Sequence, residues 1–173
     1  MPIIANAASL IVTATDGGVR ILDAAGGGLL DSWNLNALGI YGAAGVEYDS
    51  STSNVYVAGQ NYRTVVRAGF DGTGQTILTS ASDPSFGGDA PGNERLDIAL
   101  DTNGERIFFT TGRGEDVAVG NLDGTGGTTV LFPDQLAPLN GIEYNPVNDK
   151  IYFINLNTGL YSANADGTGV ANL

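Results

Sequence analysis

The chain has 173 residues and a formal net charge of −12, and 42% of its residues are hydrophobic. This length and composition fit one globular domain, and the charge disfavours nucleic acid and anionic membranes, which need clustered cations on the protein. The lack of cysteine and histidine excludes disulfides, thiol nucleophiles, thiolate zinc sites and imidazole bases.

The first predicted unit, residues 2–44, carries four short runs of β-branched and apolar residues. A Gly-rich turn that begins at Asp23 separates the last two runs, and such residues supply the positive φ angles of tight hairpins. This unit matches the later ones least well. Its expected strands are Ile3–Asn6, Leu10–Thr13, Val19–Leu22 and Leu29–Trp33.

The next three units, residues 45–95, 96–140 and 141–173, repeat one order of motifs. Each opens on a five-residue strand, and a second β-rich run begins six residues after the closing Asp or Asn. A third strand leads into an Asp-Gly-Thr-Gly turn, and a fourth follows it. The expected strands are Gly45–Asp49, Val55–Val57, Val65–Phe70 and Gln75–Thr79, then Asp97–Asp101, Ile107–Phe109, Val117–Leu122 and Thr128–Phe132, then Gly141–Asn145, Ile151–Phe153, Leu160–Ala165 and Val170–Leu173.

Four-stranded antiparallel units that recur every 40 to 50 residues or so are typical of β-propeller blades. No segment keeps a 3.6-residue apolar period, so we expect essentially no helix. The sequence therefore predicts an all-β, β-propeller-type fold of four consecutive four-stranded antiparallel blades. A sandwich or jelly roll is the alternative, but neither explains why the turn residues recur in phase.

The sequence resembles the YWTD blades of low-density-lipoprotein-receptor-type propellers and their bacterial relatives. The resemblance rests on Asp97–Asp101, Arg106–Thr111 and Val119–Gly126, and residues 141–169 repeat that pattern. It covers residues 45–173 well and the first 44 poorly. The final Asp of the Tyr-Trp-Thr-Asp motif is missing throughout, so the resemblance implies the fold and not a specific receptor partner.

Propellers of that family usually close with six blades, whereas this chain offers four. Four blades can close alone, a pair of chains can give eight, or blades can stack openly across subunits. We favour self-assembly into a ring or filament through the faces of the first and last blades. An open stack of such faces is heterologous and gives a fibre, whereas closure gives a ring.

Partner-binding residues are expected on the rim that carries the loops 34–44, 81–95 and 133–140, because long loops between short strands often bind ligands. The opposite rim consists of Asp-Gly-type turns, which turn chemistry explains without a ligand. The candidates on the first rim are Tyr41, Tyr62, Arg63, Phe86, Asp89, Arg113, Asn155 and Asn157.

Three carboxylates on the innermost strands, Glu47, Asp97 and Glu143, are candidate ligands for an axial cation such as Ca²⁺, which prefers oxygen ligands. Pairing of each carboxylate with an Arg or a backbone amide is the alternative. We otherwise expect no cofactor.

We expect a non-enzymatic interaction or structural module that self-assembles, with a protein or glycan as a further partner, and no nucleic acid or membrane insertion. An extracellular or particle-surface location is expected, with a cytoplasmic one left open. One alternative is a metal-dependent hydrolase similar to lactonase-type propellers, built on Glu47, Asp97, Asn140 and Glu143. The other is a carbohydrate-binding propeller, although its expected aromatic–amide pairs do not recur at matching positions.

Overall fold

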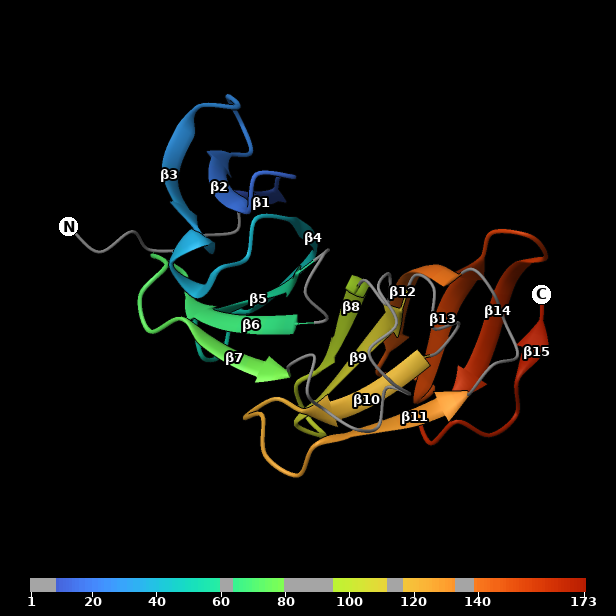
Figure 1. Cartoon of the computed structure of the whole chain (residues 1–173). Coiled ribbons are helices and arrows are strands. Elements are labelled where there is room, and N and C mark those ends of the chain that lie inside the picture. Colours follow the sequence, from blue (N-terminus) through green and yellow to red (C-terminus); the bar gives the residue numbers. More distant parts are fainter. Residues whose placement is uncertain (1–8, 60–63, 80–94, 112–116, 133–138) are drawn as a thin grey trace.

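The computed structural model describes residues 9–59, 64–79, 95–111, 117–132 and 139–173, and they form four antiparallel sheets in chain order (Figure 1). In each sheet, every strand pairs with the strand that precedes it in the chain. Sheet 1 contains β1 (Ser9–Thr13), β2 (Gly18–Asp23) and β3 (Leu29–Asn34), and sheet 2 contains β4 (Ala43–Asp49), β5 (Asn54–Gly59), β6 (Thr64–Gly69) and β7 (Thr76–Thr79). Sheet 3 contains β8 (Arg95–Asp101), β9 (Arg106–Thr111), β10 (Val117–Asn121) and β11 (Thr128–Phe132), and sheet 4 contains β12 (Leu139–Asn145), β13 (Lys150–Asn155), β14 (Gly159–Asn164) and β15 (Ala171–Asn172).

This order confirms the all-β, propeller-type fold and rules out the sandwich alternative, because each sheet is one self-contained run of the chain. Sheet 1 has three strands among the described residues, and the expected strand Ile3–Asn6 lies outside them. Within the described ranges the only helical element is the 3₁₀ turn η1 (Asn36–Leu38), which links sheets 1 and 2.

The Asp-Gly-Thr-Gly turns have the same conformation in sheets 2, 3 and 4. In the first of them, Oδ1 of Asp71 accepts hydrogen bonds from the backbone N–H of Thr73 at 3.1 Å and from its hydroxyl at 2.7 Å. Asp123 and Asp166 bind the threonines two residues ahead in the same way. The glycine after each aspartate has a φ of +77° to +86°, which a residue with a Cβ rarely adopts. The repeated Asp, Gly and Thr residues therefore form the tight turns between strands that the sequence predicted.

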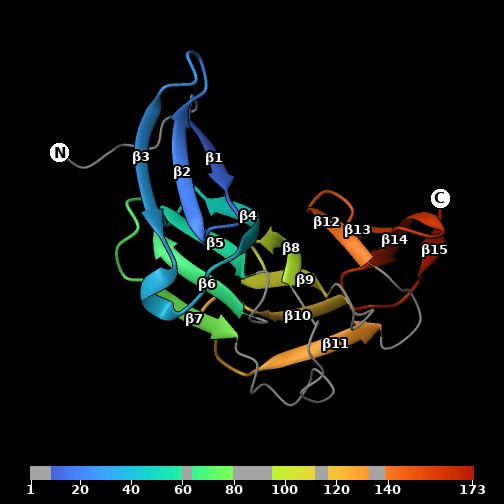
Figure 2. The same cartoon turned by 45° about the horizontal axis from the view of Figure 1, so that its top comes forward.

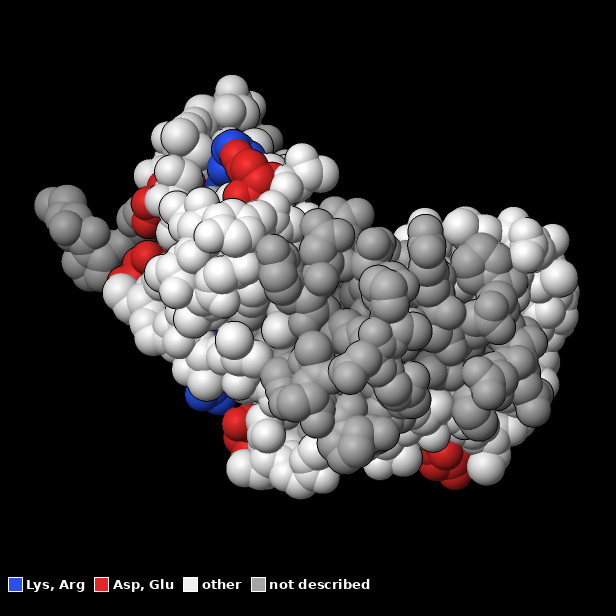
Figure 3. All heavy atoms as spheres, in the orientation of Figure 1, with Lys and Arg blue, Asp and Glu red and all other residues white. Residues whose placement is uncertain are grey.

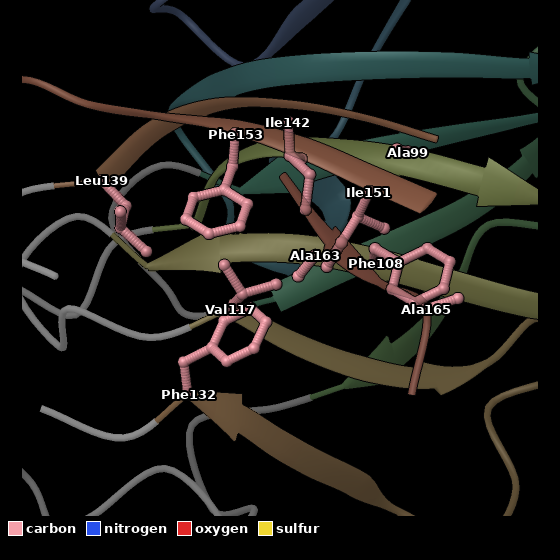
Figure 4. Close-up of a cluster of buried hydrophobic side chains, with 10 residues drawn as sticks. All are labelled: Ala99, Phe108, Val117, Phe132, Leu139, Ile142, Ile151, Phe153, Ala163 and Ala165. Atoms are coloured by element: carbon pink, nitrogen blue, oxygen red, sulfur yellow. The ribbon is translucent and has the colours of Figure 1, made fainter. Parts of the chain in front are cut away.

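Buried apolar side chains form three clusters, and each cluster lies between neighbouring sheets. The cluster between sheets 3 and 4 is built around Phe108, Phe132 and Phe153 (Figure 4). The ring centroids of Phe132 and Phe153 lie 5.5 Å apart. The described residues thus form three separate cores between sheets, and each sheet is stabilised by the sheets beside it, as in repeat proteins.

The four sheets follow one another along an open arc, with sheets 1 and 4 at opposite ends (Figures 1 and 2). The strands β4, β8 and β12 contact one another in sequence at the inner side of the arc, and β1 contacts β4. The propeller is therefore not closed within a single chain.

Candidate functional site

Asp97 joins three sheets at the inner side of the arc. Its Oδ2 accepts a hydrogen bond from the backbone N–H of Ile142 in β12 at 3.0 Å, and its Oδ1 accepts one from Ile98 at 3.1 Å. A Cβ placed on Gly45 of β4 would overlap the Asp97 side chain. Burial raises the pKa of Asp97, and the two backbone hydrogen bonds act in the opposite direction. Asp97 is therefore held between β4 and β12 by backbone contacts.

Glu47 and Glu143 occupy matching positions on β4 and β12, and the charge of Asp97 contributes to a raised pKa of both side chains. Burial raises the pKa of Glu47 to about 7, with further increases from the charges of Glu143 and Asp97. Burial, followed by the charge of Asp97, also raises the pKa of Glu143. The three carboxylates thus face a common region at the inner side of the arc.

The described residues nevertheless contain no group of three acidic side chains that could hold a metal ion. Asp97 instead takes backbone amides as partners, as the alternative to a cation site predicts. The geometry gives the Ca²⁺ hypothesis no support, and the same holds for the hydrolase set of Glu47, Asp97, Asn140 and Glu143.

Most of the rim candidates fall outside the described residues, namely Tyr62, Arg63, Phe86, Asp89 and Arg113. Among the rest, Tyr41 and Asn157 are exposed.

Asn155, the remaining rim candidate, is 3% exposed. Its Oδ1 accepts backbone hydrogen bonds from Asn157 at 2.8 Å and from Thr158 at 3.0 Å, so the side chain orders its own turn. The partner site on this rim therefore stays a prediction, because most of its residues lie outside the described ones.

A polar pocket of about 460 Å³ opens on the opposite rim, between sheets 2 and 3. Arg67 of β6 lies in its lining, as does Tyr56, and the charge of Arg67 partly offsets the rise that burial causes in the pKa of Tyr56. Sequence reasoning missed this pocket because it treated the turn rim as purely structural. An arginine within the apolar run of β6 was the available signal.

The corresponding place between sheets 3 and 4 is occupied by an arginine. Arg106, the first residue of β9, donates to Oδ2 of Asp101 at 2.6 Å and to Oδ1 of Asp149 in the next sheet at 3.1 Å. The first residue of β5 is Asn54, which cannot make such an ion pair. The two interfaces therefore share an architecture but differ in polar chemistry.

The outward face of sheet 4 exposes apolar positions that are buried in sheets 2 and 3. Val65, Val117 and Leu160 each lie six residues before the aspartate of the following turn. Val65 and Val117 are 0% exposed, because they pack against the next sheet, whereas Leu160 is 45% exposed. Sheet 4 thus presents the surface that sheets 2 and 3 use to pack on a neighbour.

Sheet 1 exposes the complementary face. Leu10 is the second residue of β1, as Val55, Ile107 and Ile151 are of β5, β9 and β13. Those three are 0% exposed and belong to the cluster that each sheet shares with the preceding one, but Leu10 is 53% exposed.

In the view of Figure 3, Asp, Glu, Lys and Arg side chains are sparse over the described part of sheet 4, at the right. Outside sheets 1 and 4 and their turns, the only exposed large apolar side chains among the described residues are Tyr41 and Ile77. The exposed apolar surface is therefore gathered at the two ends of the arc.

Comparison with known proteins supports the fold. No protein-family model and no curated protein sequence matches the chain. A chain in the crystal structure of a nidogen/laminin complex is similar, with 22% identity, a TM-score of 0.75, and coverage of 94% of this chain and 60% of that one. A structural-genomics protein of unknown function from Bacteroides thetaiotaomicron has 16% identity and a TM-score of 0.68, with 98% and 41% covered. The Cps50 (Swd1) β-propeller domain of Myceliophteria thermophila has 17% identity and a TM-score of 0.61, with 90% and 46% covered.

These likenesses show the β-propeller fold, and the present chain spans less than two thirds of each of these structures. Among the described residues, no helix has the length and apolar character needed to cross a membrane.

Proposed function

We propose that this protein is a non-enzymatic interaction module that self-associates through the outward faces of sheets 1 and 4. The observation that carries the proposal is the contrast between equivalent positions. Leu160 and Leu10 are 45% and 53% exposed, whereas their counterparts inside the arc are 0% exposed. A repeat unit cannot bury its apolar faces alone, so end units need either polar faces or a neighbour. Here the end faces are apolar.

Exposed apolar residues that are grouped on one face, and not scattered singly, are typical of protein interaction sites. Each apolar side chain that becomes fully buried contributes about 1.5–3 kcal/mol relative to exposure. The net charge of −12 opposes association through repulsion between copies. Salt screens that repulsion, since the Debye length falls from about 30 Å at 0.01 M to about 8 Å at 0.15 M ionic strength. We therefore expect association to strengthen as salt is added.

Molar mass in solution, measured by light scattering over a concentration series, tests the proposal. The mass is expected to rise above the 17.7 kDa of one chain as concentration increases. Leu160→Lys, which places a cation in the apolar face of sheet 4, should weaken association at least tenfold, a loss of about 1.4 kcal/mol.

Val147→Lys is the matched control, because Val147 is 92% exposed in a turn and the substitution changes the net charge equally. It should change association by less than about twofold, which corresponds to a few tenths of a kcal/mol. A mass that stays at 17.7 kDa at every concentration, or an equal loss in both variants, contradicts the proposal.

The non-enzymatic part of the proposal is supported by the chain's lack of histidine and cysteine and by the lack of a metal-holding acidic group among the described residues. The proposal includes membership of the YWTD class, which the sequence resemblance supports, and an extracellular or particle-surface location for the interaction module. A protein or glycan partner on the rim remains part of the proposal, and its residues are the rim candidates named above.

A further inference from the structure

One contact recurs at each of the three interfaces between sheets. The glycine that follows the turn aspartate lies against a side chain from the outermost strand of the preceding sheet. A Cβ placed on Gly72 would overlap the ring of Trp33 in β3. A Cβ on Gly124 would lie 3.1 Å from Cδ2 of Leu78 in β7, and one on Gly167 would lie 3.2 Å from Cβ of Leu131 in β11.

The turn of sheet 1 contains the equivalent glycine, Gly27. The backbone N–H of Gly27 donates to the carbonyl of Asp23, four residues earlier, and the backbone N–H of Gly72 likewise donates to the carbonyl of Gly69, three residues earlier in its own turn. Gly27 also has a φ of +68°, close to the +77° of Gly72. Around Gly27, however, no atom of the described residues lies within 4 Å of an added Cβ, so the described part of the chain supplies no equivalent neighbour.

Leu173 is the equivalent of Leu78 and Leu131 in sheet 4. Leu78 follows Ile77, which pairs with Val66, and Leu131 follows Val130, which pairs with Ala118. Leu173 follows Asn172, which pairs with Tyr161. The partners Val66, Ala118 and Tyr161 each lie six residues before the turn glycine, so the three leucines share one position.

Leu173 is 65% exposed, so it also lacks its neighbour. The chain therefore carries both halves of the recurring contact, one at each end of the arc. From this we infer that copies of the chain join head to tail, with Leu173 of one copy packed on the Gly27 turn of the next. The inference rests on the proposed self-association and specifies its orientation and its contact. Because the joined surfaces differ, the contact is heterologous, and each added copy exposes a new end.

Disulfide trapping tests the contact, since the natural chain contains no cysteine. Ala25→Cys places a thiol in the exposed turn of Gly27, and Leu173→Cys places one at the other end. The turn between β2 and β3 lies far from the C-terminus in one chain (Figures 1 and 2), so a disulfide between these two segments joins two copies.

The double variant should give a ladder of oxidised dimers, trimers and longer species on non-reducing gels, whereas each single variant should stay mainly monomeric. Dimers that form equally well in a single variant would show a symmetric pairing and overturn the head-to-tail arrangement.

Gly27→Asn provides a second test that leaves the outermost leucine in place. Asparagine tolerates positive φ, and the added side chain meets open space in the single chain but occupies the place of the incoming Leu173. Gly39→Asn is the matched control, because Gly39 has a φ of +75° and also has no atom within 4 Å of an added Cβ.

Association measured by light scattering should weaken at least tenfold in Gly27→Asn and less than about twofold in Gly39→Asn. If Gly27→Asn associates as strongly as the natural chain, the contact is wrong while the proposed function stands. If the natural chain does not associate at all, both are wrong.

Discussion

Sheets 3 and 4 share nearly the same sequence pattern but have different surroundings. Phe108 and Tyr152 occupy the same position in β9 and β13, yet Phe108 is 0% exposed and Tyr152 is only half-buried. Phe108 packs within the cluster shared with sheet 4, whereas no sheet among the described residues packs on the equivalent face of sheet 4. The burial of an apolar residue in this fold is therefore set by the adjacent sheet and not by its own strand, so matched substitutions can measure what a neighbour contributes.

The largest difference in the free energy of unfolding between matched substitutions is expected at these aromatic positions. Phe108→Ala should lower the free energy of unfolding by about 3–5 kcal/mol, because it opens a cavity between sheets 3 and 4. Tyr152→Ala should cost less than about 1 kcal/mol, because water already reaches that face. Urea denaturation at concentrations where the chain is monomeric measures both values. Equal losses would show that the two faces do not differ in packing.

A smaller difference in the free energy of unfolding is expected when the cations that begin the same two strands are replaced. Arg106 bridges Asp101, which is 3% exposed, to Asp149 in sheet 4, whereas Lys150 donates to Asn164 of its own sheet at 3.2 Å. Arg106→Met should cost about 2–3 kcal/mol, because it leaves the Asp101 carboxylate buried without its cation, although partial exposure of Arg106 moderates the loss. Lys150→Met should cost less than about 0.5 kcal/mol. Thermal or urea unfolding of the two variants side by side checks the contrast, and a Lys150→Met loss as large as that of Arg106→Met would contradict it.

Much of this fold could be predicted from sequence because the turn residues have a local cause. Asp71, Asp123 and Asp166 each accept a hydrogen bond from the threonine two residues ahead, so a few adjacent residues determine where each hairpin turns. The packing between sheets depends on residues far apart in the chain, such as Leu78 against Gly124, and no local pattern predicts this contact. The sequence therefore predicted the strands and their order better than the contacts that join the sheets.

The candidate sites were harder to predict for the same reason. The matching positions of Glu47 and Glu143 were visible in the sequence, and the charge of Glu143 contributes, after burial, to the raised pKa of Glu47. The sequence could not show that Asp97 takes its partners from the backbone of β12. Likewise, the pocket beside Arg67 forms only where the turns of sheet 3 meet sheet 2.

The turn glycines offer a third contrast, between a turn with a neighbour and one without. Gly27→Ala should cost about 1–2 kcal/mol, because an alanine is strained at positive φ. Gly72→Ala should cost more than that, because the new methyl group also displaces the Trp33 ring. The difference between the two losses, measured by urea denaturation of the monomer, isolates the contact between sheets 1 and 2. No difference would mean that the Trp33 ring moves aside freely.

The smallest effect on stability is expected from the titration of Glu47 at the inner side of the arc. Burial raises the pKa of Glu47 from 4.5 to about 7, so the folded chain binds this proton more tightly than the unfolded chain. The resulting stability is fully present below about pH 4.5 and is lost as pH rises through about 7. Glu47→Gln should therefore flatten the dependence of the urea midpoint on pH across this window and raise the midpoint at pH 8.

Glu143→Gln sharpens the same comparison, because the charge of Glu143 contributes to the raised pKa of Glu47. This variant should keep the pH dependence but shift it to lower pH, since Glu47 then loses its proton more readily. The effect should be smaller than that of the packing substitutions, because both side chains are partly exposed and solvent screens their interaction. If Glu143→Gln leaves the pH profile unchanged, the two carboxylates do not share a common region, and burial with the charge of Asp97 sets the pKa of Glu47.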